Sequence, residues 1–161
     1  MILEGSCHCQ RVRFRLESAH PYPFNLCYCS ICRKTAGSGG FGINLGGVAE
    51  SLSVSGEEHI RVYRAGIVDA SGAVVDSPAE RRFCQHCGSA LWVWDPRWPE
   101  LIHPSASAID TPLPTPPERV HLMLDSKAEW VTPAIGEHDQ QYAEYPAESI
   151  ADWHQRRELE R

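Results

Sequence analysis

Long hydrophobic runs are missing from this chain of 161 residues. No stretch approaches the roughly 20 apolar residues that a membrane-spanning helix requires, so we expect no membrane as a partner. The first residues, 1–7, carry neither the basic region nor the apolar region of a signal peptide. We therefore expect a cytoplasmic protein, in which cysteines stay reduced and more often bind metal than form disulfides.

An excess of positive charge is also missing, because the formal net charge is −6 at pH 7. Nonspecific binding to nucleic acid requires a basic surface. The basic residues that cluster at all do so as isolated pairs, Arg33-Lys34, Arg81-Arg82 and Arg156-Arg157. The sequence therefore argues against nucleic acid as a partner and leaves small molecules as the expected ligands.

Long helical patterns are scarce, and short alternating runs take their place. In the clearest one, Val12, Phe14 and Leu16 alternate with charged residues, as in a half-buried strand. Further short β-like runs are Phe41–Leu45, Ser51–Val54, His59–Tyr63, Ala73–Val75, Leu91–Trp94 and Val120–Leu124. The sequence predicts a mainly β fold built from short antiparallel sheets.

The carboxyl-terminal third departs from this pattern. Prolines concentrate in residues 95–118, for which we expect a long extended connection without regular structure. Residues 147–159 place acidic side chains early and basic ones late, which favours a short C-terminal helix. We expect one domain over residues 1–161, with a core at about 3–130 and a C-terminal extension at 131–161.

Seven cysteines fall into three groups, Cys7/Cys9, Cys27/Cys29/Cys32 and Cys84/Cys87, and no cysteine lies outside them. An odd number does not complete a set of disulfides. Grouped thiols at these spacings are typical of zinc sites, so the sequence predicts metal binding.

The triplet predicts an open zinc site. In an extended segment Cys27 and Cys29 point to the same side, and a tight turn brings in Cys32. Three protein ligands with a free fourth position are typical of catalytic zinc, whereas structural zinc has four. We therefore interpret Cys27, Cys29 and Cys32 as the catalytic centre, and we call their three sulfurs the cup.

The remaining cysteines predict a closed zinc site. Cys84 and Cys87 form a Cys-x-x-Cys-Gly knuckle, and Cys7 and Cys9 form a second chelating pair. We favour a structural site made by these four residues. An alternative joins Cys29 and Cys32 to the knuckle and leaves Cys7, Cys9 and Cys27 over.

Residues beside the triplet are candidates for binding the substrate. Arg33 and Lys34 could attract an anionic ligand, although both are equally well explained as solvated residues after a turn. Gly39 and Gly40 belong to a glycine-rich loop in which a ligand could approach the backbone, or which is simply a flexible turn.

Other candidates have structural explanations that we favour. His8 should face away from the flanking cysteines, and His86 at the knuckle tip should face solvent. Trp92 and Trp94 share one face of a predicted strand, and core packing is the favoured role for such large rings over a substrate platform.

Three ordered motifs carry a resemblance to a known family. They are Gly5-Ser6-Cys7-His8-Cys9 with Val12-Arg13-Phe14, Cys27-x-Cys29-Ser30-x-Cys32-Arg33-Lys34, and Phe83-Cys84-x-x-Cys87-Gly88-Ser89-x-Leu91. Together with Ser126-Lys127-Ala128-x-Trp130 they resemble the glutathione-dependent formaldehyde-activating enzyme family, which includes the centromere protein V domain. The resemblance implies a β-tent fold with two zinc ions per chain, one structural and one catalytic, on the cysteine sets favoured above.

The resemblance also implies a function. It points to a carbon–sulfur lyase that forms or cleaves thiol–aldehyde adducts, such as S-(hydroxymethyl)glutathione from glutathione and formaldehyde. Glutathione would be the co-substrate, and the partners would be a small thiol and an aldehyde. The alternative is a non-catalytic, zinc-stabilised interaction module or a thiol-based redox sensor.

Overall fold

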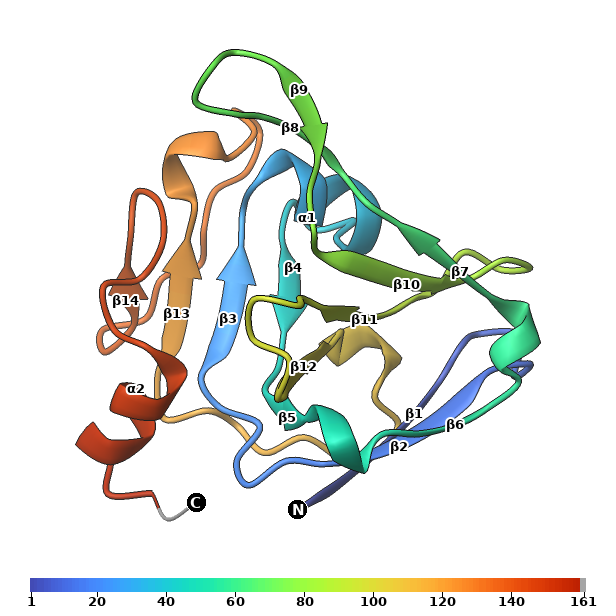
Figure 1. Cartoon of the computed structure of the whole chain (residues 1–161). Helices are drawn as coiled ribbons and strands as arrows, with labels where there is room; N and C mark the ends of the chain where they lie inside the picture. The colour runs from blue at the N-terminus through green and yellow to red at the C-terminus, as the bar shows by residue number, and fades with distance from the viewer. Residues whose placement is uncertain (160–161) are drawn as a thin grey trace.

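Short strands make up most of the regular secondary structure in the computed structural model, which describes residues 1–159 (Figure 1). Two sheets form the part of the molecule that carries the N-terminus. The first has the order β1-β2-β6 and is antiparallel throughout. Its strands are β1 (Ile2–Ser6), β2 (Arg13–Glu17) and β6 (Ser53–Ser55). The alternation predicted for β2 is confirmed, since Phe14 and Leu16 are buried and their neighbours are exposed.

The second sheet is five-stranded, with the order β5-β12-β11-β10-β7, and is also antiparallel. Its strands are β5 (Gly47–Val48), β7 (Ile60–Tyr63), β10 (Glu80–Cys84), β11 (Ala90–Trp94) and β12 (Leu101–Pro104). Trp92 of β11 packs edge to face against Phe14 of β2, with ring centroids 5.1 Å apart. This contact lies in the main hydrophobic core, which the first two sheets share.

A third sheet positions the triplet of cysteines. Its order is β14-β13-β3-β4, with β14 (Gln140–Gln141), β13 (Arg119–Leu122), β3 (Phe24–Cys27) and β4 (Gly42–Asn44). β13 runs parallel to both of its neighbours, whereas β3 and β4 are antiparallel. The long chain between β3 and β13 allows this parallel pairing. The mainly β prediction with short antiparallel sheets is confirmed, and the parallel pairs are an addition to it.

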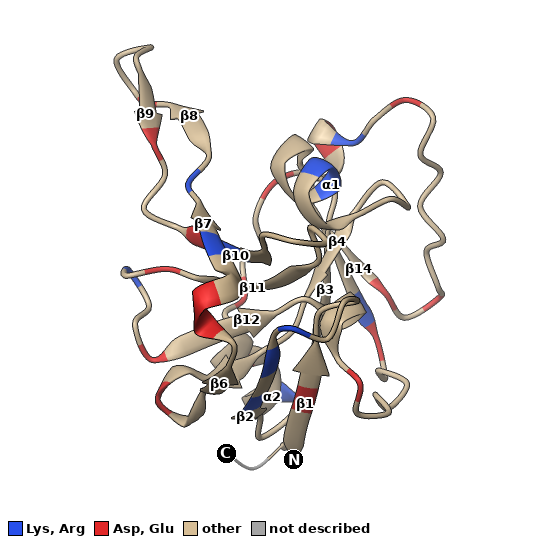
Figure 2. Ribbon diagram, turned by 90° about the vertical axis from the view of Figure 1, so that its right-hand side faces the viewer, with Lys and Arg blue, Asp and Glu red and all other residues tan. Residues whose placement is uncertain are grey.

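A two-stranded hairpin, β8 (Gly66–Val68) and β9 (Val74–Asp76), projects from the body (Figure 2). Two α-helices are present among the described residues, α1 (Ser30–Ala36) and α2 (Ile150–Arg156). Short 3-10 helices are η1 (Ala49–Ser51), η2 (Glu57–His59), η3 (Ala106–Ala108) and η4 (Leu124–Ser126). The predicted C-terminal helix therefore exists as α2 but is shorter than 147–159. Among the described residues, no helix is both long enough and apolar enough to cross a membrane.

The proline-rich stretch contradicts one expectation. Residues 95–118 include β12, which pairs with β11 and with β5. The prolines do not interrupt this pairing, because most of them lie outside the strand and Pro104 is its last residue. Pro104 lacks an N–H but still accepts a hydrogen bond from the Leu45 N–H through its carbonyl oxygen, at 2.9 Å.

Candidate metal centres

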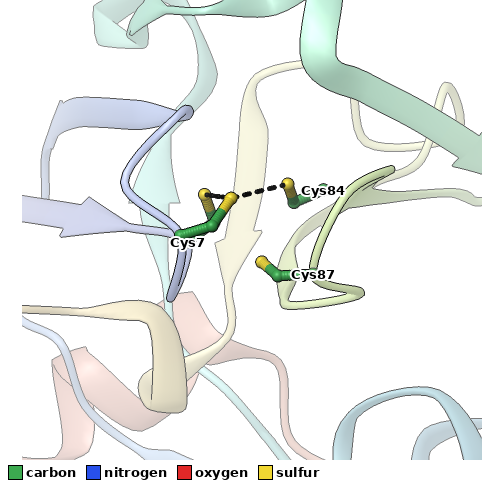
Figure 3. Close-up of side chains that lie close together, drawn as sticks. Cys7, Cys84 and Cys87 are labelled. Carbon is green, nitrogen blue, oxygen red and sulfur yellow. Dashed lines mark hydrogen bonds between the residues drawn. The ribbon is translucent and has the colours of Figure 1, made fainter.

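Four cysteine sulfurs converge from two distant parts of the chain (Figure 3). Cys7 and Cys9 lie in the turn between β1 and β2, Cys84 ends β10, and Cys87 lies in the turn that follows. The Cys7 and Cys9 sulfurs are 3.5 Å apart, and those of Cys9 and Cys84 are 3.7 Å apart. All four sulfurs lie within 4.8 Å of one another.

This spacing fits a tetrahedral metal ion bound by thiolates. With zinc–sulfur bonds of about 2.3 Å, neighbouring sulfurs on a tetrahedron are about 3.8 Å apart. The two short sulfur–sulfur distances are close to that value. The donor set therefore suits zinc, and four ligands leave no position for a substrate.

Local hydrogen bonds shape both halves of this centre. The Gly88 N–H donates to the Cys84 carbonyl oxygen at 2.8 Å, and Gly88 has a φ of 73°, which a glycine adopts without strain. Burial raises the pKa of Cys84 to about 11. The Ser89 hydroxyl, 3.2 Å from the Cys87 sulfur, lowers the pKa of that exposed thiol to about 5. One thiol of the knuckle is thus prepared as the thiolate that a metal binds.

The cup is a separate cluster at the junction of β3 and α1. Cys27 ends β3, Cys29 is the N-cap of α1, and Cys32 lies in the first turn of that helix. Their sulfurs lie within 4.8 Å of one another. The alternative grouping of Cys29 and Cys32 with the knuckle is therefore not the one that the structure brings together.

Hydrogen bonds within the cup favour one thiolate. The Cys32 backbone N–H donates to the Cys29 sulfur at 3.3 Å. Hydrogen bonds from the thiols of Cys27 and Cys32 hold the pKa of Cys29 well below its ordinary value. The same sharing raises the pKa of Cys27, which keeps its proton as the donor. The N-terminus of α1 thus presents a thiolate at the cup. The sequence predicted a tight turn at this position, and the structure has the short helix α1.

Two polar side chains that no sequence motif marks face the cup. The Arg81 guanidinium of β10 lies 3.7 Å from the Cys32 sulfur through Nη1. The Asn44 side-chain amide of β4 lies 3.9 Å from the same sulfur. The sequence signal for Arg81 is weak, because only the strand register shows which of Arg81 and Arg82 points this way.

A buried chain of polar groups supports the cup from behind. The Asp139 carboxylate lies 3.1 Å from His121 Nε2, and His121 Nδ1 lies 2.9 Å from the Tyr28 hydroxyl oxygen, within hydrogen-bond distance. Tyr28 is fully buried and stands between Cys27 and Cys29 in the chain. Anchoring Tyr28 therefore fixes the backbone that presents both sulfurs.

The predicted substrate residues follow the cup along the chain. Arg33 and Lys34 are on α1, where Figure 2 shows basic positions. Gly39 and Gly40 follow the helix, and Gly40 has a φ of 96°. A Cβ atom on Gly40 would lie 2.3 Å from Val131, so close packing against the C-terminal part of the chain requires a glycine there. The loop glycines have a packing role, whether or not a ligand approaches them.

Two of the residues for which structural roles were favoured are exposed histidines. His8 is exposed, and so is His86, whose Nε2 is 3.0 Å from His59 Nδ1. Trp92 is a core residue, while Trp94 is half-buried and lines a groove with Arg82.

A family model and a curated relative agree on one family. The family model described as glutathione-dependent formaldehyde-activating enzyme matches residues 2–125. A Halomonas elongata protein, named as a candidate glutathione-dependent formaldehyde-activating enzyme, is 62% identical over 160 residues, or 99% of each chain. A crystal structure of a Rhodobacter sphaeroides protein covers 69% of this chain and 91% of its own, with a TM-score of 0.53 and 24% identity. That last likeness indicates a shared fold alone.

Proposed function

Because the chain belongs to the glutathione-dependent formaldehyde-activating enzyme family, we propose that it is a zinc-dependent carbon–sulfur lyase. Its reaction forms S-(hydroxymethyl)glutathione from glutathione and formaldehyde, or cleaves the adduct into these two compounds. The observation that carries this proposal is the pairing of a complete set of four sulfurs with a separate set of three. Only the set of three has room for a sulfur from outside the protein.

The two sets have different roles in this proposal. Cys7, Cys9, Cys84 and Cys87 would hold a structural zinc. Cys27, Cys29 and Cys32 would hold a catalytic zinc, which when bound lowers the pKa of a coordinated thiol so that it is present as a thiolate. Two zinc ions per chain follow from this assignment.

The reaction itself balances without a further reactant. The thiol of glutathione loses its proton, its sulfur bonds to the carbonyl carbon of formaldehyde, and the C=O π electrons move to the oxygen. One proton from solvent then neutralises that oxygen, which gives the hydroxymethyl group. In the reverse direction the carbon–sulfur bond breaks and both reactants are released.

Basic side chains near the cup support an anionic substrate. Arg81 lies against Cys32, where a guanidinium offsets negative charge on the sulfurs and can donate to a developing oxyanion. Arg33 and Lys34 on α1 could attract the carboxylates of glutathione.

The test is an exchange measurement by NMR on a mixture of glutathione and formaldehyde. Zinc-loaded wild-type protein should speed exchange between free glutathione and its hydroxymethyl adduct. Because the uncatalysed reaction is appreciable, the control is an equal concentration of folded Cys29→Ser, which should give no acceleration. Absence of acceleration by the wild type with glutathione and with other small thiols would contradict the proposal and favour a non-catalytic module.

A further inference from the structure

Two nitrogen donors from different sheets converge on one sulfur of the cup. Arg81 Nη1 lies 3.7 Å from the Cys32 sulfur and comes from β10 of the second sheet. Asn44 Nδ2 lies 3.9 Å from the same sulfur and comes from β4 of the third sheet. Figure 1 shows both strands close to α1, the helix that carries Cys32. The Cys32 side of the cup is therefore where two sheets present side-chain N–H groups.

Neither donor is held tightly by this sulfur. The Cys32 backbone N–H that caps α1 lies 3.3 Å from the Cys29 sulfur, and both side-chain contacts are longer. A guanidinium carries several N–H groups, and a side-chain amide carries a pair. Among residues 1–159, the Cys32 sulfur is the one hydrogen-bond partner of the Arg81 guanidinium and of the Asn44 amide nitrogen. Both side chains thus retain N–H groups for a further acceptor.

Arg81 also differs from its neighbours in its charge partners. Arg64 and Arg82 both form ion pairs with Glu80. In the described part of the chain, no carboxylate pairs with the half-buried Arg81. A charge that is partly removed from water requires an opposite charge nearby, and here the cup sulfurs supply it. The same surroundings favour a second negative charge that develops beside the cup.

The sulfur of a bound thiol would lie close to these donors. In the closed centre, neighbouring sulfurs are 3.5 and 3.7 Å apart, and a sulfur that joined the cup as its fourth member would lie at a similar distance from Cys32. The two donors lie 3.7 and 3.9 Å from Cys32. In an S-hydroxymethyl group a single carbon separates the oxygen from the sulfur, so the oxygen can extend from the bound sulfur toward the donors.

We propose that Asn44 and Arg81 form the binding site for the aldehyde oxygen, on the Cys32 side of the cup, and that Asn44 is a further catalytic residue. This inference rests on the proposed function. As the thiolate sulfur bonds to the carbonyl carbon, the π electrons move to the oxygen. The two donors stabilise the negative charge there until a proton from solvent neutralises it. Removal of one such donor commonly lowers kcat by about a hundredfold to a thousandfold.

The variants separate the amide of Asn44 from the strand that carries it. Asn44→Leu removes the N–H groups and keeps a side chain of similar size. Asn44→Asp keeps the shape of the amide and also lacks an N–H group, so it replaces the leucine variant if that variant does not fold. Asn25 of β3 is the matched control, because it lies directly opposite Asn44 in the antiparallel register. Within residues 1–159, the cup sulfurs accept no hydrogen bond from the Asn25 amide.

The first measurement is the NMR exchange rate at saturating glutathione with formaldehyde varied, on zinc-loaded proteins of equal zinc content. We expect both Asn44 variants to lower kcat at least about tenfold, because a donor to the developing oxyanion is lost. Their affinity for glutathione, measured by calorimetric titration, should equal that of the wild type. Asn25→Leu should match the wild type in both measurements.

The second measurement requires no turnover. S-formylglutathione carries an oxygen on the carbon bonded to sulfur, whereas S-methylglutathione carries none. In calorimetric titration, the wild type and Asn25→Leu should bind the S-formyl compound about tenfold more tightly, as expected for a hydrogen bond to a charged group. Asn44→Leu and Asn44→Asp should reduce this preference severalfold.

The outcomes distinguish this inference from the proposed function. Wild-type kcat and an unchanged S-formyl preference in both Asn44 variants would overturn the inference and leave the function standing. A matching loss of glutathione affinity would also overturn it, because Asn44 would then act on the thiol. An equal loss in Asn25→Leu would assign the effect to the sheet and overturn it as well. If the wild type accelerated no exchange, the function and the inference would both fail.

Discussion

Arg81 is the cation that lies against the cup, through its contact with the Cys32 sulfur. Its neighbour Arg82 forms an ion pair with Glu80 instead, at 2.5 Å. Successive residues of a strand point to opposite faces, so these two arginines share a strand and differ in what they face. They therefore form a natural pair for mutagenesis.

We predict that Arg81→Gln lowers kcat/KM for adduct formation by about tenfold to hundredfold, because a charged donor beside the reacting groups is lost. Arg81→Lys should recover part of the activity, since the charge returns without the planar fork. Steady-state exchange rates and zinc content check this. Arg82→Gln should retain activity; an equal loss in both variants would mean that Arg81 acts only through the sheet.

Asp139 belongs to the buried chain of polar groups, with His121 and Tyr28, that supports the cup. Burial opposes its ionisation, but hydrogen bonds from the N–H groups of Gly136 and Arg119 outweigh this and lower its pKa. A carboxyl with a lowered folded pKa stabilises the fold above the unfolded pKa of about 3.9, and this contribution is lost as pH falls through the folded pKa.

We therefore predict that Asp139→Asn lowers the free energy of unfolding by about 1–3 kcal/mol at neutral pH, and that the gap to wild type narrows below about pH 4. Urea unfolding at a series of pH values checks this, with both proteins loaded identically. The exposed Asp125 gives a control, Asp125→Asn, that should match the wild type. A gap that stays constant into acid would contradict the role of the carboxylate.

The limits of sequence reasoning at this scale follow from distance along the chain. Cys27, Cys29 and Cys32 could be grouped because their spacing alone brings their sulfurs together. Arg81 could not be found this way, because strand register brings it to the cup. The sequence therefore predicted the two cysteine clusters better than it predicted their surroundings.

β10 is the element that connects the two centres. Arg81 on this strand reaches the cup, and Cys84 at its end belongs to the set of four. That set also ties β10 to the turn between β1 and β2. Metal there would cross-link two sheets, whereas the cup draws its three sulfurs from one short stretch.

This difference predicts unequal effects of ligand loss on stability. Cys84→Ser should lower the melting temperature by roughly 10 °C or more, since structural metal binding contributes folding free energy and each kcal/mol corresponds to about 2–4 °C in a chain of this size. Cys32→Ser should melt close to the wild type yet lose activity. Thermal melts of the two variants check the assignment, which fails if Cys32→Ser is the more damaging.

Two elements, α1 and β12, show why the sequence patterns did not predict the whole fold. α1 has no long periodic pattern; it begins because the Cys29 sulfur accepts from the Cys32 N–H, a cap that a cysteine rarely signals in sequence. β12 forms in a proline-rich stretch because its partners β5 and β11 supply the pairing. Tertiary pairing outweighed local preference at β12.

At the scale of the whole molecule, the centres belong to different sheets. The closed set joins the first two sheets, and the cup sits on the third sheet with α1. Residues 140–141 then add β14 to the third sheet, and Tyr142 packs against the cluster that contains Cys27 and Cys32. The short alternating runs of the sequence indicated the mainly β class. Which sheet carries which cysteine cluster could be learned only from the three-dimensional structure.

The central claim is that one centre is closed and the other accepts the sulfur of glutathione. Cadmium NMR on protein loaded with an NMR-active cadmium isotope tests it most directly. We predict two signals, of which Cys29→Ser removes or shifts only one, and glutathione should move that same signal while the other stays in place. A single signal at full loading, or a glutathione response at the Cys7, Cys9, Cys84 and Cys87 centre, would contradict the account.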